Sequence, residues 1–199
     1  RNDWRYLDKR MKFRILVTLA FLISSLTSCE NTPGIAPVGE MEVLPYYDLK
    51  GFVLQEIEKM DSSNQVSKIT RINGEEKRSD VTFSKEDWKE ELDAFLEADI
   101  NKPSLATSFT TEIKGDILIH QAKPEAKTTI KEIQVRIVDD KPVWLRFRGA
   151  KESIFYTSYI NGGIYMNAFT DKIDHYELES TQKIWFLSPN NMKIQCAVR

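Results

Sequence analysis

The second half of the chain is a series of short segments in which apolar and polar residues alternate. Alternation with a period of two is typical of β-strands that bury one face, and short turns between them favour antiparallel pairing. With 65–72 and 75–81, eleven segments are candidate strands, and we expect a sheet of about eight to ten of them. The later segments are 108–113, 116–122, 133–137, 143–147, 152–160, 164–169, 175–180, 182–187 and 192–198.

Two glycine-containing sequences predict the tightest turns. Asn73-Gly74 separates 65–72 from 75–81 and is typical of a type I′ hairpin, in which both central residues need positive φ. The returning segment 75–81 is highly charged, so we expect an edge strand or one with a solvated outer face. Asn161-Gly162-Gly163 likewise predicts a hairpin between 152–160 and 164–169.

Two helices are predicted before residue 104. The first begins at Asp48 and places apolar residues on one stripe, with Glu56 among the polar residues opposite. Gly51 lies in its first turn, which indicates either close backbone packing or a later helix start. The second has Ser84 as its N-cap and Asp87 three residues on, and Pro103 marks its end. Its Phe83 and Trp88 match a hydrophobic staple, and its buried stripe is Trp88, Leu92, Phe95 and Leu96.

Helices placed early and strands placed late indicate an α+β fold. We expect a large curved antiparallel sheet with the two helices packed on one face. This arrangement resembles the half-barrels of the lipoprotein carriers LolA and LolB, in which helices cover a curved sheet around an apolar groove. The resemblance is one of architecture, and no sequence motif supports it.

Residues 11–29, MKFRILVTLAFLISSLTSC, predict export and lipidation. Lys12 and Arg14 precede an apolar run, 15–26, of the length of a signal peptide and too short to span a bilayer. Leu26-Thr27-Ser28-Cys29 resembles the lipobox of bacterial lipoproteins. The resemblance implies cleavage before Cys29 and a diacylglyceryl group on its thiol, with palmitate or a similar chain on the new amine. Two or three acyl chains anchor a protein stably.

These features divide the chain into four parts. We interpret 1–10 as an upstream extension of the reading frame, 11–28 as the signal peptide, 29–45 as the lipidated cysteine with a Pro- and Gly-containing tether, and 46–199 as one domain. We expect the protein in the cell envelope, anchored to the outer membrane, because Glu30 rather than Asp follows the cysteine. The sequence leaves the periplasmic or surface side open. The chain as a whole resembles small β-rich bacterial lipoproteins.

The charge of the predicted mature chain argues against nucleic acid as a partner. Residues 1–28 hold six Lys and Arg and two Asp, which leaves 22 basic and 28 acidic side chains and a net charge of −6. A nucleic-acid-binding surface needs a basic footprint. We expect a monomer whose membrane contact is the lipid anchor.

Residues for catalysis or metal binding are sparse. The two histidines, His120 and His175, have no second ligand at a metal-binding spacing, and the sequence lacks G-x-S-x-G. Cys196 is left without a disulfide partner, and the alternation of Met192, Ile194, Cys196 and Val198 predicts a buried side chain on a strand. We therefore expect no enzyme, no metal and no cofactor.

Aromatic residues in the later strands are the candidate binding residues. Adjacent aromatics such as Phe155-Tyr156 must point to opposite faces, so aromatics lie on both sides of the sheet. In one interpretation, one set packs under the helices and the other lies on the solvent face or covers a loop. In the alternative, the second face lines a groove for an apolar or glycan ligand, or for a partner. The candidate face comprises Trp144, Tyr156, Tyr159, Tyr165 and Trp185.

Two functions follow from that face. The first is a non-enzymatic binding or carrier module for an amphiphile, such as a lipid or a lipoprotein, with an apolar cavity between sheet and helices. The second is a structural or interaction subunit of an outer-membrane complex, with a filled core and an exposed aromatic patch that binds an envelope protein.

Overall fold

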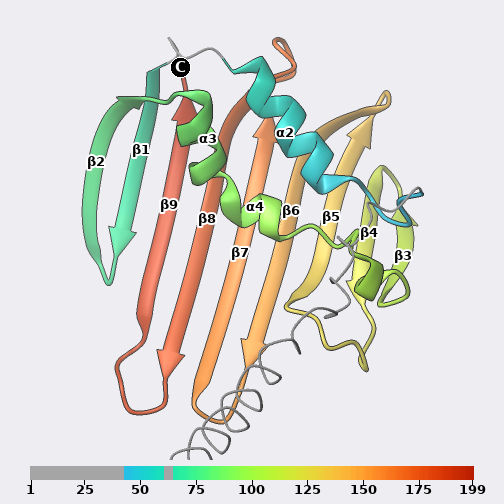
Figure 1. Cartoon of the computed structure of the whole chain (residues 1–199). Helices are drawn as coiled ribbons and strands as arrows, with labels where there is room; N and C mark the ends of the chain where they lie inside the picture. The colour runs from blue at the N-terminus through green and yellow to red at the C-terminus, as the bar shows by residue number, and fades with distance from the viewer. Residues whose placement is uncertain (1–42, 61–64) are drawn as a thin grey trace, which may run out of the picture. The chain divides into compact units, whose positions relative to one another are not determined.

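The computed structural model describes residues 43–60 and 65–199. These residues form one nine-stranded antiparallel sheet with three α-helices, which confirms the predicted α+β class (Figure 1). The signal peptide, Cys29 and most of the predicted tether lie outside the described residues. The elements are α2 (Leu49–Lys59), β1 (Gln65–Ile72), β2 (Glu75–Thr82), α3 (Lys85–Glu91), α4 (Asp93–Glu97), the 3-10 turn η2 (Pro103–Leu105), β3 (Phe109–Lys114), β4 (Ile117–Ala122), β5 (Ile130–Val138), β6 (Lys141–Glu152), β7 (Tyr156–Met166), β8 (Ile173–Ile184) and β9 (Asn190–Val198).

The sheet has the order β2-β1-β9-β8-β7-β6-β5-β4-β3. Strands β3 to β9 form a meander in which each strand pairs with the next. The long-range step is the pairing of β1 with β9, which sets Val66 opposite Val198. The first hairpin is thereby added beside the last strand, and the predicted edge position of the charged β2 is confirmed.

The β1–β2 hairpin has the predicted turn. Asn73 and Gly74 have φ of 51° and 95°, as a type I′ turn requires. Asp139 and Asp140 take the same left-handed conformation between β5 and β6, with φ of 51° and 60°. Asp and Asn tolerate this region better than other residues with a Cβ, so both turns fit their sequences.

Helix α2 begins as predicted but buries one unexpected residue. The Asp48 carboxylate accepts a hydrogen bond from the Gly51 N–H at 2.8 Å. A Cβ on Gly51 would lie 2.1 Å from the Asp48 Oδ2, so the glycine makes room for the cap. The prediction that Glu56 lies on the exposed side is wrong. Glu56 is buried, with Lys59 as its partner at 2.5 Å, because the buried face of this helix is wider than its apolar stripe.

The second predicted helix is two helices. Its start has the predicted capping box between Ser84 and Asp87, and the rings of Phe83 and Trp88 pack edge to face at 5.0 Å. The helix then ends at Leu92, which has φ −96° and ψ 9°, and α4 starts there without a side-chain cap. Trp88, Leu92 and Phe95 are nevertheless buried as predicted, and Leu96 is partly buried.

The predicted hairpin at Asn161-Gly162-Gly163 is wrong, because these residues lie in the middle of β7. Asn161 pairs with Arg148 on β6 and Glu179 on β8. A Cβ on Gly162 would lie 2.3 Å from the Cε1 of Phe147 on the facing strand. The glycine therefore provides space for a ring and does not turn the chain. The segments 175–180 and 182–187 are likewise not separate strands, since β8 runs unbroken through Thr181.

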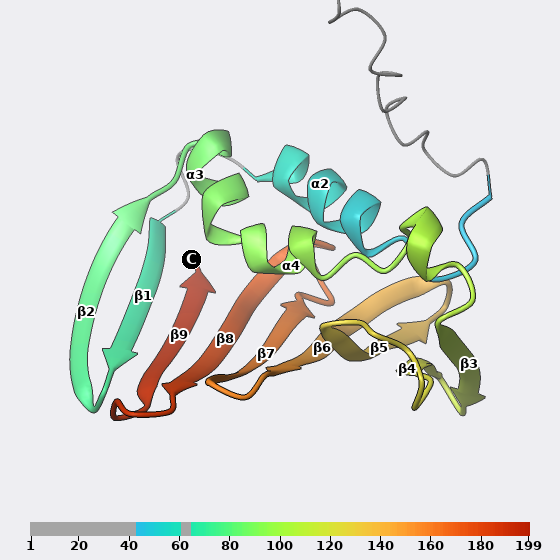
Figure 2. The same ribbon diagram turned by 60° about the horizontal axis from the view of Figure 1, so that its bottom comes forward.

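All three α-helices lie on one face of the sheet and leave the other face uncovered (Figure 2). The core between the two layers is aromatic. Phe95 packs edge to face on Phe147 at 5.2 Å and on Tyr176 at 6.4 Å, and Trp88 meets Tyr176 at 6.3 Å. The Tyr176 hydroxyl donates to Glu91, which also pairs with Lys68, so a polar link joins α3 to β1 and β8.

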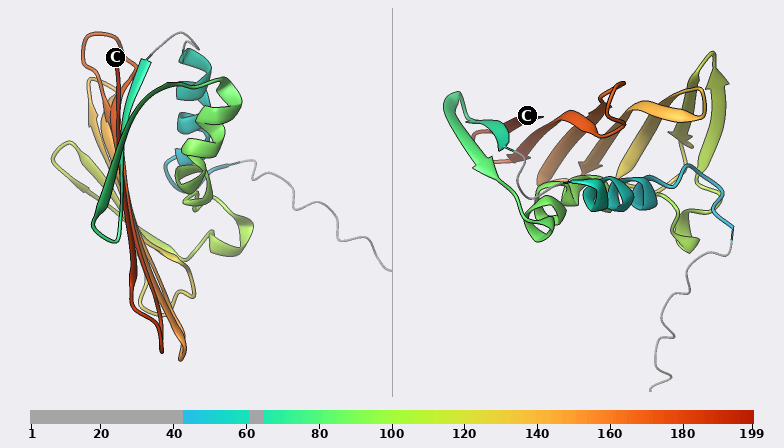
Figure 3. Two further views of the ribbon diagram at one scale, coloured as in Figure 1. Left: turned by 90° about the vertical axis from the view of Figure 1, so that its left-hand side faces the viewer. Right: turned by 90° about the horizontal axis from the view of Figure 1, so that it is seen from above.

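The helices cover only part of the sheet. Seen edge-on, the long strands project well beyond the helix layer at one end (Figure 3). Strands β6, β7 and β8 have 12, 11 and 12 residues. We call the ends that extend past the helices the projecting end of the sheet.

Candidate binding surface

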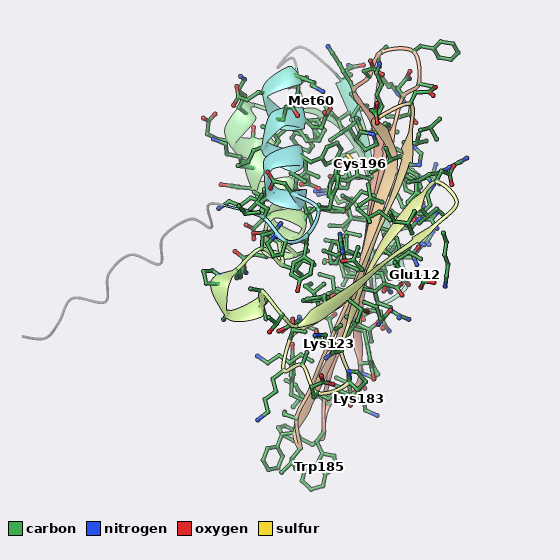
Figure 4. All side chains as sticks on the ribbon, turned by 90° about the vertical axis from the view of Figure 1, so that its right-hand side faces the viewer. Met60, Glu112, Lys123, Lys183, Trp185 and Cys196 are labelled. Atoms are coloured by element: carbon green, nitrogen blue, oxygen red, sulfur yellow. The ribbon has the colours of Figure 1, made fainter. Side chains whose placement is uncertain are left out.

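The five predicted aromatic residues fall in three places. Trp144 on β6 is directly opposite Tyr165 on β7, on the helix-free face, and Tyr159 follows on the same face. Tyr156 alternates onto the helix side of the sheet, opposite Ile184. Trp185 directly follows β8 and lies at the projecting end (Figure 4). The structure thus brings together Trp144 and Tyr165 and separates the other three from them.

Arg146 lies beside both rings of the Trp144–Tyr165 pair. The guanidinium carbon of Arg146 lies 4.8 Å from the centre of the Trp144 ring and 5.3 Å from that of Tyr165. Its Nε donates a hydrogen bond to the Tyr165 hydroxyl at 3.1 Å. Alternation along β6 places Trp144 and Arg146 on one face. The position of Tyr165 beside them follows from the register of β6 with β7, which the sequence alone does not give.

The Tyr165 ring is fixed from two further sides. Its hydroxyl donates to Glu177 Oε1 at 2.9 Å, and the His175 ring stacks on it at 4.4 Å with an 11° tilt. Burial and the Glu177 carboxylate raise the pKa of Tyr165, so the phenol stays protonated at neutral pH. We call Trp144, Arg146, Tyr165, His175 and Glu177 the arginine–aromatic cluster.

A polar hollow of about 340 Å³ adjoins the cluster on the same face. Arg146 and Glu177 belong to both the cluster and the hollow. Three cationic and three acidic side chains line the hollow, and Arg148 and Glu132 are 3.7 Å apart there. A hollow with this balance suits a ligand that carries both charges and hydrogen-bonding groups. The lining residues are Glu132, Gln134, Arg146, Phe147, Arg148, Asn161, Gly162, Glu177, Leu178, Glu179 and Lys193.

A second hollow lies on the helix side. It has a volume of about 400 Å³ and is bounded by α4 and η2 on one side and by the sheet on the other. Ala98 and Leu105 come from the helix layer, and Phe147 and Ile160 from the sheet. The hollow ends where the packed core of Phe95 and Phe147 begins.

His120 supports the fold through both ring nitrogens. Its Nε2 accepts the Tyr47 backbone N–H at 3.0 Å, and its Nδ1 is 2.9 Å from Thr111 Oγ1. Burial lowers its pKa, which keeps the ring neutral. The neutral tautomer that donates from Nδ1 to Thr111 satisfies both contacts.

Cys196 is buried, as predicted from the alternation in β9. Burial is the main reason that the pKa of its thiol rises to about 11, which leaves almost no thiolate at neutral pH. A nucleophilic cysteine needs the opposite environment. Cys196 therefore acts as a core residue.

Within residues 43–60 and 65–199, no three His, Cys, Asp or Glu side chains gather as a metal site. In the same ranges no helix has both the length and the apolar character needed to cross a membrane. The predicted lipidation site, Cys29, lies outside these ranges.

Comparison with protein-family models, with curated proteins and with solved structures finds no match to this chain.

Proposed function

We propose that this chain is a lipid-anchored interaction protein of the bacterial outer membrane. Its anchor is the lipid on Cys29, predicted from Leu26-Thr27-Ser28-Cys29. Its binding surface is the helix-free face, centred on the arginine–aromatic cluster and the polar hollow. The partner is an envelope protein, bound without catalysis.

The observation that carries this proposal is the position of Arg146. Its guanidinium lies beside both aromatic rings of the cluster and is hydrogen-bonded to Tyr165, which is itself held by Glu177. Trp, Tyr and Arg are the residues most enriched at the energetic centres of protein interfaces. A side chain that is already fixed loses little conformational entropy on binding. The cluster is therefore a preorganised anchor point.

The charges of the hollow indicate the kind of partner. Arg148 is the cross-strand neighbour of Glu132, and Lys193 that of Glu179, so neither sign dominates. A nucleic acid would meet unfavourable carboxylates, and an acyl chain would remove these charged groups from water without offering them hydrogen bonds in return. A protein surface or a peptide can offer both signs together.

Cross-linking in cells tests this proposal. A photoreactive amino acid replaces Gln134 in the hollow or Thr110, which is on the same face at the β3 edge. We expect one partner to cross-link from position 134 and not from 110. Arg146→Ala and Trp144→Ala should abolish that product while the thermal midpoint of unfolding stays high enough for full folding at the growth temperature. An unchanged product in both variants would overturn the proposed surface.

The anchor has its own test. Cells grown with a labelled fatty acid should incorporate label into the wild-type chain and not into the Cys29→Ser variant. The wild type should fractionate with the outer membrane. Label that persists in Cys29→Ser would place the acyl group elsewhere.

The second hollow supports a second candidate function, the carriage of an amphiphile. Its apolar residues, among them Leu105, Ile130 and Ile160, could enclose part of one acyl chain. Native mass spectrometry of the purified chain would show a bound lipid, and Ile160→Trp would displace it by filling the hollow. The filled core beside it, Phe95 against Phe147, makes this the weaker candidate.

A further inference from the structure

Two neighbouring loops at the projecting end expose a group of large apolar side chains. One loop joins β6 to β7 and the other joins β8 to β9. Figure 4 shows Trp185 at the extreme end of the sheet, far from Met60 at the end of α2. We call the group the apolar tip; its five side chains are between 53 and 87% exposed. They are Ile154, Phe155, Trp185, Phe186 and Leu187.

The apolar tip is one structure, although its residues come from two loops. The Trp185 N–H donates to the Phe155 carbonyl at 3.0 Å, and their rings lie 6.1 Å apart. The Ser153 N–H donates to the Tyr156 carbonyl at 2.8 Å, and the Leu187 N–H to the Ile184 carbonyl at 2.9 Å. These backbone bonds fix the conformations of both loops.

Charged residues stop short of the apolar tip. None occurs in residues 153–158 or 184–192. The nearest are Lys151, Glu152 and Lys183, and Glu152 accepts the Tyr159 hydroxyl at 2.8 Å. Two lysines therefore flank the apolar tip, and the neighbouring carboxylate is engaged.

We propose that the apolar tip inserts into the surface of a lipid bilayer. Trp and Phe rings are favoured at the level of the head groups, and lysine side chains at such a boundary extend their amines toward water. The apolar tip lies beyond the helix layer (Figure 3), and its five residues line neither of the two hollows described above, so it suits a deformable lipid surface better than the apolar segment of a protein. Isolated exposed apolar residues are ordinary, whereas a contiguous group of this size indicates a binding site.

The position of the predicted anchor fits this proposal. This fit rests on the proposed function, in which Cys29 is lipidated. Fourteen residue steps separate Cys29 from Val43, where the described domain begins, and can span at most about 50 Å. The 11 residues of β7 extend over about 36 Å. The anchor and the apolar tip can therefore reach the same bilayer, and two attachment points would restrict how the domain is oriented.

Tryptophan fluorescence tests the insertion. The purified full chain is reconstituted in phosphatidylcholine vesicles, with and without bromine on the acyl chains as a short-range quencher. We expect brominated lipid to quench the wild type, and Trp185→Phe to lose most of that quenching. Trp144→Phe is the matched control and should keep it, because Trp144 lies on the helix-free face and outside the apolar tip. Phe186→Ser with Leu187→Ser should reduce the quenching of Trp185.

Three results would overturn the proposal. The first is quenching that is the same in wild type and Trp185→Phe. The second is a dimer of the purified chain that Phe186→Ser dissociates, because a second copy would then cover the apolar tip. The third is the combination of two findings: mass spectrometry detects no acyl group on the chain, and saturating brominated lipid does not quench Trp185. An unacylated chain with Trp185 quenching would refute the anchor and support the tip.

Discussion

The two ends of the long strands have opposite surroundings. Under the helices, Leu145, Ile164 and Tyr176 are buried, and the Tyr176 ring packs against Phe95 and Trp88. At the projecting end, the same strands lead to the exposed apolar tip. Backbone pairing continues through both halves, so hydrogen bonding does not distinguish them.

The two ends therefore contribute differently to the stability of the fold. Burial of apolar surface is the main favourable term in folding, and most of it lies in the covered half. The projecting half gains mainly from backbone pairing, because its large side chains remain in water. Its apolar residues are thus available for an external surface at little cost to the fold.

The largest expected effect is in the covered half, at Phe95. This ring is fully buried and packs edge to face on Phe147 and Tyr176. Phe95→Ala should lower the free energy of unfolding by about 3–5 kcal/mol, since it leaves a cavity between two rings. Urea unfolding followed by circular dichroism measures the loss.

Phe186→Ala, in the apolar tip, is the matched control. Phe186 is 79% exposed, so its removal should change the free energy of unfolding by less than about 0.5 kcal/mol. Equal losses of unfolding free energy in the two variants would contradict this difference, because the projecting end would then contribute to stability as the covered end does.

The next largest loss of stability is expected at the two glycines in the middle of β7. Gly162→Ala should cost about 3 kcal/mol, because its Cβ would lie 2.3 Å from the Phe147 ring in the packed core. Gly163→Ala faces the uncovered side, where its Cβ would lie 3.1 Å from the Tyr165 ring, so a shift of a few tenths of an ångström relieves the contact. Its cost should be under about 1 kcal/mol. Thermal unfolding of both variants gives the ranking, and a reversed order would contradict the assignment of the two faces.

Local signals predicted the elements that depend on a few adjacent residues. The cap at Ser84, the staple of Phe83 on Trp88 and the turn at Asn73-Gly74 are confirmed because each is a short-range arrangement. The alternation in β9 gave the burial of Cys196 for the same reason.

Long-range packing explains the errors. Gly162-Gly163 reads as a turn in the sequence, and only the Phe147 ring from another strand explains it as a space for a side chain. The misplaced turn also hid the register that joins Tyr165 to Trp144 and Arg146. The pairing of β1 with β9 and the burial of Glu56 likewise depend on residues distant in sequence.

A pH effect follows from His120 in the covered layer. Burial lowers its pKa below the ordinary value of 6.5, so the unfolded chain takes up a proton first as the pH falls. Stability should be complete above about pH 6.5 and should decline below it, because protonation also removes the acceptor for the Tyr47 N–H.

Urea unfolding between pH 8 and pH 5 measures this decline. His120→Gln should flatten the profile, although it lowers stability throughout. A steep profile that survives His120→Gln would assign the pH dependence to other groups.

Apart from the control variants, the smallest expected loss of stability is at the N-cap of α3. Ser84 Oγ accepts the Asp87 N–H at 3.2 Å, and Asp87 Oδ2 accepts the Ser84 N–H at 2.8 Å. Ser84→Ala should cost about 1 kcal/mol, and Ser84→Asp, another good cap, should restore most of it. The loss should appear in unfolding of the covered half and leave lipid quenching of Trp185 unchanged, because α3 lies over the opposite end of the sheet. If Ser84→Ala also weakened that quenching, the two ends would be coupled through the strands they share.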